Sequence, residues 1–229
     1  MKGKYSKIEV MKKVLKNFVE CNEVVFNIEV VERYEKLVRE SGVKLKNVCS
    51  YTTREKRENE TDGVEHWFID MPTANKLINE ETILAYTKIG PYQYFATRET
   101  AMKNKENIYL IDPKGVHWMK KNNPDMDIVE INIRVTEEVR AERCKERSDF
   151  ATSFVDRCKA EDDQFTAYEY YDNSDLIVYN DNFENALAEI ISFIIKNNKV
   201  NMYLVIGRTG VGKDSLMEAA KDMINEVYL

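Results

Sequence analysis

The sequence predicts an α/β fold with a central parallel sheet, and three observations support this prediction. Short apolar segments alternate with helical segments along most of the 229 residues, which is the pattern of βαβ units. The last apolar segment, residues 201–207, runs into a glycine-rich loop that a helical stretch follows. With 43% hydrophobic residues, a chain of this length can bury a substantial core. We therefore expect one large domain, or one domain with an appendage.

The first part of the chain is predicted to be helical and then to change to short strands. Residues 1–41 carry apolar side chains at helical spacing, and Gly42 is a suitable stop for the second helix. A strand is expected within 47–53, a turn and an aromatic strand in 62–70, and a helix in 71–80. The apolar positions that indicate the helices of 1–41 are Val10, Val14, Leu15, Phe18, Tyr34, Leu37 and Val38.

The rest of the chain continues this alternation, without an internal repeat or a low-complexity segment. Its predicted strands are apolar, and the helix near the end of the chain is amphipathic. The expected elements are strands in 106–115, 127–135, 175–180 and 201–207, a charged helical stretch over 136–165, and a helix over 183–196.

Composition and charge argue against several classes of protein. The net charge of −6 argues against a nucleic-acid coat, and no apolar run approaches the roughly 20 residues that span a bilayer. The basic N-terminus lacks an apolar signal core, so secretion is not expected. No C-x-x-C pair is present, which indicates reduced thiols at Cys21, Cys49, Cys144 and Cys158. We expect a cytoplasmic protein without nucleic-acid or membrane partners.

The stretch GRTGVGKDS, residues 207–215, predicts a phosphate-binding loop. Its pattern is G-x-x-x-x-G-K; the glycines let backbone N–H groups close around phosphate oxygens, and the lysine contacts the outer phosphates. The helix that follows points its positive N-terminal dipole at the same anion. Asp214 stands where Ser or Thr is usual, so Ser215 is expected to supply the hydroxyl for Mg²⁺. The predicted nucleotide-binding residues are Gly207, Arg208, Thr209, Gly210, Val211, Gly212, Lys213, Asp214 and Ser215.

A second anion site is predicted in SYTTREKR, residues 50–57, at the end of a strand. Arg54 and Arg57 lie three residues apart beside hydroxyl side chains, and guanidinium groups suit phosphate oxygens because they bind them through two N–H groups. A solvated charge run is the alternative interpretation of this segment. The neighbouring segments favour the anion site.

Those neighbouring segments resemble the guanylate kinase family. SYTTREKRENETDGVEHWF (50–68) is similar to the family's nucleoside-monophosphate-binding segment, which has the pattern S-x-T-T-R-x-x-R, an acidic loop, D-G and an aromatic strand. Further blocks match at family-like spacing, and together with the phosphate loop they cover roughly residues 47–229. They are IGPYQYFATRE (89–99) for the G-x-x-Y-G-[ST] turn, IYLIDPKGV (108–116) for the strand ending in D-x-x-G, RAERCKERSDFATSFVDRCKAE (140–161) for the lid, and DLIVYNDNFENALAEIISFI (175–194) for the last strand and helix.

The order of these blocks is rotated relative to the family, in which the phosphate loop comes first. The resemblance therefore implies a circularly permuted, three-layer P-loop kinase fold, because termini can move to any surface connection that tolerates a break. Residues 1–46 are expected to be a helical appendage and 47–229 the permuted domain. Within that domain, 47–100 would bind the monophosphate, 140–160 would be the lid, and 201–229 the phosphate-loop strand and helix. We expect strand 202–206 to be parallel to, and between, strands from 47–53 and 106–112.

The resemblance implies phosphoryl transfer from ATP with Mg²⁺, which depends on positioning and charge neutralisation. Lys213 and the loop amides would hold the β- and γ-phosphates, while Arg54, Arg57 and Tyr94 would bind the acceptor's phosphate. His66 falls where the family has a tyrosine that binds this phosphate; a strand residue paired with a neighbour is the alternative for His66. The implied catalytic residues are Lys213 and the lid arginines Arg143, Arg147 and Arg157.

Recognition of guanine is only partly matched. Ser50 and Asp112 stand where the family has guanine-reading residues, but a family glutamate falls at Leu84 or Ala85 and a family aspartate at Leu110. A lost carboxylate removes an acceptor for the base, and unpaired polar edges are costly. Glu80, Glu81 and Lys88 are candidates to compensate.

The first interpretation is therefore a kinase for GMP or dGMP. An acceptor other than GMP, another nucleotide or a phosphorylated sugar, is the alternative within the enzyme class. A non-catalytic guanylate-kinase-like binding module is the alternative outside it, and the retained Gly207, Gly212 and Lys213 favour an enzyme. Small-molecule nucleotides are the expected partners, for a monomer or a homodimer.

Overall fold

The structure is a computed structural model that describes residues 5–18, 27–58, 60–103, 105, 107–145, 161, 164–169 and 174–229. The chain forms two compact units. The first consists of residues 1–45, 130–200 and 205–229, and the second of residues 46–129 and 201–204. Each unit is described by itself.

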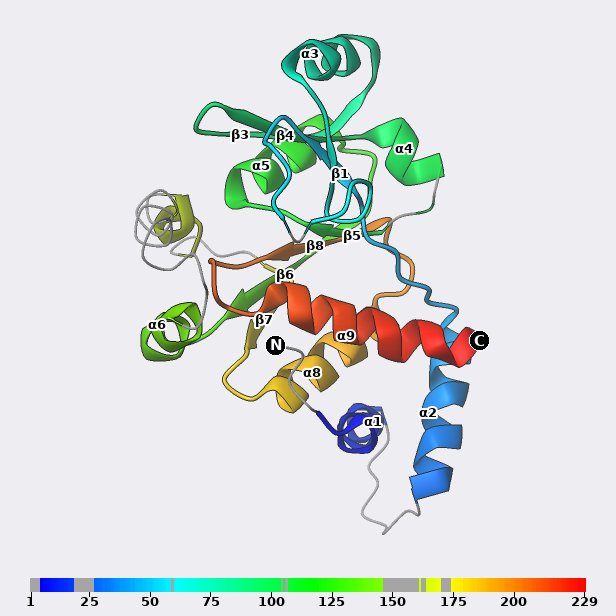
Figure 1. Ribbon diagram of the computed structural model, residues 1–229. Coiled ribbons are helices and arrows are strands. Elements are labelled where there is room, and N and C mark those ends of the chain that lie inside the picture. Colours follow the sequence, from blue (N-terminus) through cyan, green and yellow to red (C-terminus); the bar gives the residue numbers. More distant parts are fainter. Residues whose placement is uncertain are drawn as a thin grey trace. The chain divides into compact units, whose positions relative to one another are not determined.

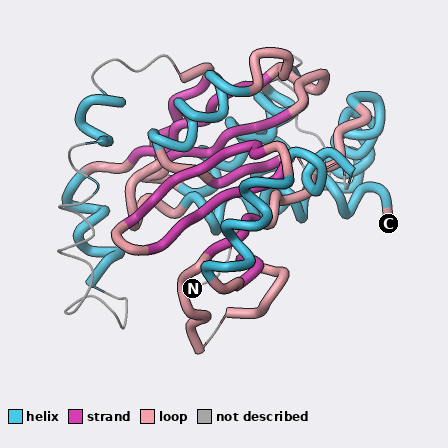
Figure 2. Tube along the Cα trace, turned by 90° about the horizontal axis from the view of Figure 1, so that it is seen from above, coloured by secondary structure: helices cyan, strands magenta, loops and turns pink. Residues whose placement is uncertain are grey.

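Helices alternate with short strands in the described part of the chain, which confirms the α/β fold class (Figure 1; Figure 2 shows the same elements coloured by type). The helices are α1 Lys7–Lys16, α2 Asn27–Ser41, α3 Met71–Glu80, α4 Arg98–Lys103, α5 Pro113–Asn122, α6 Glu137–Lys145, α8 Phe183–Lys196 and α9 Lys213–Asn225, with a short 3-10 helix η2 Glu226–Tyr228. The strands are β1 Ser50–Thr52, β2 His66–Phe68, β3 Ile83–Ile89, β4 Tyr92–Thr97, β5 Ile108–Leu110, β6 Ile128–Arg134, β7 Leu176–Tyr179 and β8 Met202–Ile206.

Strand β8 lies inside a four-stranded sheet with the order β5-β8-β6-β7. All five of its residues are buried, as an apolar run bounded on both sides by other strands requires. β6 pairs in parallel with β7, with Ile131 opposite Leu176. This pair confirms the parallel strand pairing that the alternating pattern predicted.

One predicted neighbour of β8 is wrong. β5 does flank β8, but β6 and not the segment 47–53 lies on its other side. Residues 47–53 instead reach β5 through a single bridge, from Asn47 to Ile108, and then continue as β1 in another sheet. The reason is that β6 is longer and carries the fully buried Ile131 and Ile133, so it fills the edge of β8 that the shorter segment was expected to cover.

The second unit holds a four-stranded sheet with the order β2-β1-β4-β3. β1 runs parallel to β2 and antiparallel to β4, and Ser50 pairs with His66 while Thr52 pairs with Phe68 and Tyr94. Because alternate residues of a strand share a face, Ser50, Thr52, His66 and Tyr94 lie on one face of this sheet. Of the residues predicted to bind the acceptor, Ser50, His66 and Tyr94 are therefore gathered by strand register.

The helices predicted in residues 1–41 are present as α1 and α2, and both pack within the first unit. α1 contacts α8 and α2, and its end is joined to α8 by a hydrogen bond of 2.9 Å from Asn17 to the Ser192 hydroxyl. From α2, the buried Tyr34 hydroxyl donates to the Met223 carbonyl of α9. These helices cover the strongly apolar α8, whose sequence is FENALAEIISFIIK.

The helix predicted over 136–165 is only partly seen. α6 covers 137–145, and residues 164–169 are also helical. Among the described cysteines, Cys49 is half-buried and Cys144 buried, and both are in the reduced form, whereas Cys21 and Cys158 lie outside the described residues. Within the described part of the chain, no helix has both the length and the apolar character of a membrane span.

Candidate functional site

The predicted phosphate loop connects β8 to α9, which begins at Lys213. Gly210 and Gly212 have φ angles of +89° and +88°, a left-handed conformation that a side chain at the Cβ position disfavours. The Gly212 carbonyl accepts the first hydrogen bond of α9, from the Leu216 amide at 3.1 Å. Strand, glycine turn and helix therefore have the arrangement that the sequence pattern predicted.

Close packing around the loop excludes side chains at its glycines. A Cβ atom on Gly207 would lie 2.6 Å from the carbonyl oxygen of Ile133, and one on Gly212 would lie 2.6 Å from Nδ2 of Asn180. A Cβ atom on Gly210 would collide with the buried Cys144 sulfur of α6. β6, α6 and the end of β7 thus fix the path of the loop.

A pair of donors holds the Val211 carbonyl on the outside of the loop. Nδ2 of Asn180 donates to this oxygen at 2.8 Å, and Nη1 of Arg143 donates to it at 3.3 Å. Arg143 also donates to the backbone oxygen of Asn180 at 2.7 Å. The structure therefore brings Arg143 to the phosphate loop, where it supports the loop backbone. Asn180 is 2% exposed, and its only sequence signal is its place directly after β7.

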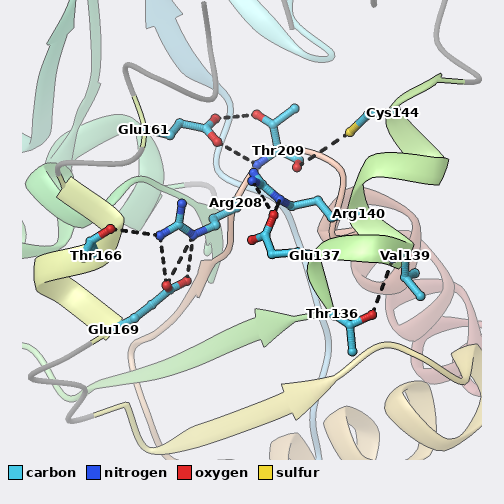
Figure 3. Close-up of polar contacts among 10 residues, drawn as sticks. All are labelled: Thr136, Glu137, Val139, Arg140, Cys144, Glu161, Thr166, Glu169, Arg208 and Thr209. Carbon is cyan, nitrogen blue, oxygen red and sulfur yellow. Dashed lines mark hydrogen bonds and ion pairs between the residues drawn. The ribbon is translucent and has the colours of Figure 1, made fainter. Parts of the chain in front are cut away.

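The carboxylates of Glu161 and Glu169 also contact the loop (Figure 3). Glu161 accepts hydrogen bonds from the Thr209 amide, at 3.0 Å, and from the Thr209 hydroxyl. Glu169 forms an ion pair with Arg208, with N–O distances of 3.0 to 3.3 Å, and the Arg208 guanidinium lies over the Phe165 ring. The sequence pattern gave no sign of these partners, because they come from a charged stretch with many equivalent acids.

Lys213 and the residues after it remain accessible. Lys213 is half-buried, and Asp214 and Ser215 are exposed in the first turn of α9. A hydroxyl and a carboxylate are oxygen donors of the type that Mg²⁺ prefers, so Ser215 and Asp214 fit a metal held jointly with phosphate oxygens. Across the described ranges, no group of three or more His, Cys, Asp and Glu side chains could hold a metal by itself.

The second predicted anion site lies in the other unit and is centred on Arg54. Its guanidinium donates to both oxygens of Glu60, each at 2.8 Å, lies over the Phe68 ring, and hydrogen-bonds to the Tyr94 side chain. Only 13% of the Arg54 side chain is exposed. Arg57 is half exposed, and its amide donates to Glu60 at 2.8 Å. The alternative interpretation of this segment, a solvated charge run, is therefore wrong for Arg54.

The Arg54–Glu60 ion pair and burial shift the pKa values of the groups at this site. The hydrogen bond from Arg54 lowers the pKa of Glu60 to about 2, with a further contribution from the Arg57 amide. Burial, and then the positive charge of Arg54, lower the pKa of His66. The imidazole is therefore disposed to be neutral, and its Nδ1 lies 2.8 Å from the Ser50 hydroxyl. Sequence reasoning missed Glu60, which belongs to the acidic loop.

Tyr109 is a further polar residue that sequence reasoning missed. Its hydroxyl hydrogen-bonds to Ser50, and burial followed by the charge of Asp112 raises its pKa. Asp112 itself caps α5, where Oδ1 accepts from the Gly115 amide at 2.9 Å. Ser50, His66 and Tyr109 thus form one hydrogen-bonded group. Of the predicted lid arginines, Arg147 and Arg157 lie outside the described residues.

A buried strand, a glycine loop and a helix beginning with lysine are together typical of the P-loop class of α/β nucleotide-binding proteins. Residues 32–197 match the family model described as "Guanylate kinase". This chain belongs to the guanylate kinase family, as its motifs predicted.

Several guanylate kinases are similar to this chain. The guanylate kinase of Mannheimia succiniciproducens is 29% identical over 150 residues, which cover 63% of this chain and 71% of that protein. The guanylate kinase of Clostridium acetobutylicum is 25% identical over 183 residues, covering 78% and 82%. Among solved structures, the guanylate kinase from Anaplasma phagocytophilum aligns with a TM-score of 0.48 and 17% identity, covering 72% of this chain and 80% of that one.

Proposed function

We propose that this protein is a kinase that transfers a phosphoryl group from ATP to a nucleoside monophosphate, with GMP and dGMP as the first candidates. The geometry of the phosphate loop carries the proposal, because Gly210 and Gly212 adopt left-handed conformations within the three residues before Lys213. A non-catalytic binding module would not need to retain this loop. Membership of the guanylate kinase family supports the choice of acceptor.

On the donor side, backbone amides of residues 207–215 would bind the β- and γ-phosphates, and Lys213 would neutralise their charge. Ser215 and Asp214 would hold Mg²⁺ together with the phosphates. When bound there, the metal ion would supply positive charge that offsets the charge developing during transfer. The lid arginines, Arg143 among them, would add positive charge around the transferred group.

On the acceptor side, Arg54 would bind the phosphate through its planar fork of N–H groups. Tyr94 and His66 lie on the same face of the sheet, and the guanidinium of Arg57, whose side chain is half exposed, lies 3.9 Å from Glu60. Glu60 orients Arg54 before any ligand binds. A preoriented guanidinium loses less side-chain entropy when it binds phosphate.

An acceptor other than GMP is favoured by one observation. The positions that correspond to the family's base-reading carboxylates are occupied by Leu84 or Ala85, which are both buried, and by Leu110. Ser50 and Asp112 remain as candidate base contacts, but Asp112 already caps α5. Release of ADP should therefore be measured with GMP, dGMP, AMP, CMP, UMP and dTMP, using Lys213→Ala as the blank. Turnover with none of them would refute the kinase proposal, and a preference for another base would replace GMP.

We also propose that the domain is a circular permutation. At the end of α9, Asn225 exchanges two hydrogen bonds with the backbone of Leu45, at 2.9 and 2.7 Å, so the helix ends beside the segment that leads into β1. A rearranged chain in which residues 200–229 are placed directly before residue 46 should then still fold. If that chain shows no cooperative unfolding transition, the proposal of a permutation is contradicted. A cytoplasmic location and a monomeric or dimeric state remain predictions.

A further inference from the structure

The phosphate loop is already in contact with an anion of the protein itself. One oxygen of Glu161 accepts from the Thr209 amide at 3.0 Å, and the other accepts from the Thr209 hydroxyl (Figure 3). Thr209 is 8% exposed, Glu161 is half-buried, and the contact between them is partly buried. A carboxylate on a backbone N–H of the loop uses the same type of donor that a nucleotide phosphate uses.

A second carboxylate on the same stretch strengthens the contact. Glu169 pairs with Arg208, the residue before Thr209, and only 12% of the Arg208 side chain and 26% of the Glu169 side chain are exposed. The Arg208 guanidinium also covers the Phe165 ring, 5.5 Å from its centroid. Glu161 and Glu169 thus contact adjacent residues of the loop, Thr209 and Arg208.

The loop does not depend on Glu161 for its shape. Asn180 and Arg143 hold the Val211 carbonyl, and close packing against Ile133 and Cys144 fixes Gly207 and Gly210. These contacts approach the loop from its backbone carbonyls and glycine Cα atoms, whereas Glu161 occupies an N–H donor. Glu161 therefore binds a backbone N–H group of the loop, and backbone N–H groups are the donors that a bound phosphate would use.

We propose that Glu161 is an internal competitor of the donor nucleotide, which the nucleotide's phosphates displace from Thr209. This inference rests on the proposed function, since it requires the loop to bind a nucleoside triphosphate. Two anions in a partly buried site repel each other more strongly than in water, because the effective dielectric constant there is lower. Binding of the triphosphate therefore costs the energy of the Glu161 contact, and the free protein is stabilised by the same contact.

The test replaces Glu161 with glutamine, which keeps the size of the side chain and removes its charge. Glu161→Gln should bind AMP-PNP with Mg²⁺ about tenfold more tightly, since a hydrogen bond to a charged group is worth about that factor or more. The melting temperature of the free variant should fall. Inorganic pyrophosphate, which has no base, should show the same gain. The matched control is Glu138→Gln, which removes an exposed acid in the first turn of α6 and should change neither quantity.

The two readouts separate competition from a supporting role. If Glu161 positioned Thr209 for the nucleotide, its replacement would lower both the melting temperature and the affinity, and that result would overturn the inference. Unchanged affinity would overturn it as well. If the unmodified protein binds no AMP-PNP while retaining its fold, the proposed function fails, and with it the inference. Should Glu161→Gln not fold, Glu161→Asp shortens the reach of the carboxylate and is expected to give a smaller gain in affinity.

Discussion

Replacing Arg54 with lysine should impair use of the acceptor far more than binding of ATP. Arg54 donates through two nitrogens to Glu60 and is held between the Phe68 ring and Tyr94. Lysine keeps the positive charge but cannot form the planar fork that binds two oxygens at once. The loss of one charge-assisted hydrogen bond, about 1.5–3 kcal/mol, corresponds to a decrease of about 10- to 100-fold in kcat/KM for the acceptor.

The assay is a steady-state measurement of kcat and KM for each accepted monophosphate, with ATP affinity determined separately by calorimetry. Because phosphate recognition does not depend on the base, the loss should be similar for every acceptor. The matched control is Arg98→Lys, which alters a more exposed ion pair with Asp125 in the same unit and should leave acceptor kinetics unchanged. If ATP binding collapses while acceptor kinetics stay normal, the assignment of the two anion sites is reversed.

Three further outcomes are expected. Lys213→Ala should lower turnover by about 100-fold or more while the circular dichroism spectrum is retained; normal turnover would contradict the role of this lysine. Gly212→Ala should reduce the melting temperature much more than Gly90→Ala, because both have positive φ but only Gly212 lacks space for a Cβ atom; equal effects would contradict the packing argument. Because the pKa of Glu60 is lowered on folding, ionised Glu60 stabilises the fold fully above pH 4.5, and this stabilisation should disappear as the pH falls from 4.5 towards about 2. In an acid titration, Glu60→Gln should lack this part of the loss of stability; a variant that loses stability over this range as the unmodified protein does would contradict the argument.

The elements most accurately predicted from the sequence are those with local signals. The phosphate loop is specified by glycines at fixed spacing after an apolar run, and its strand and helix are present as β8 and α9. The neighbours of β8 depend instead on competition between distant strands, which no local pattern describes. The segment 47–53 was therefore assigned to an edge that β6 occupies.

The site residues also divide into those with a local sequence signal and those without one. Arg54 and Tyr94 were predicted because they belong to matching motifs; Tyr94 is placed by its pairing with Thr52, and Arg54 follows β1 two residues later. Tyr109 and Asn180 were missed because their importance arises from packing against residues far away in the sequence. Glu60 was missed for a different reason, since an acidic loop next to basic residues offers several equivalent partners and only the folded backbone selects one.

The place of β8 in the chain has a consequence for how the protein is synthesised. Both of its sheet neighbours, β5 and β6, leave the ribosome before it does, and β8 has to enter between them. Until that happens, an edge of each neighbour has backbone N–H and C=O groups without strand partners, and such edges are sites of aggregation in nascent chains. Production of this protein should therefore be sensitive to translation rate and to chaperone supply, even where the finished fold is stable.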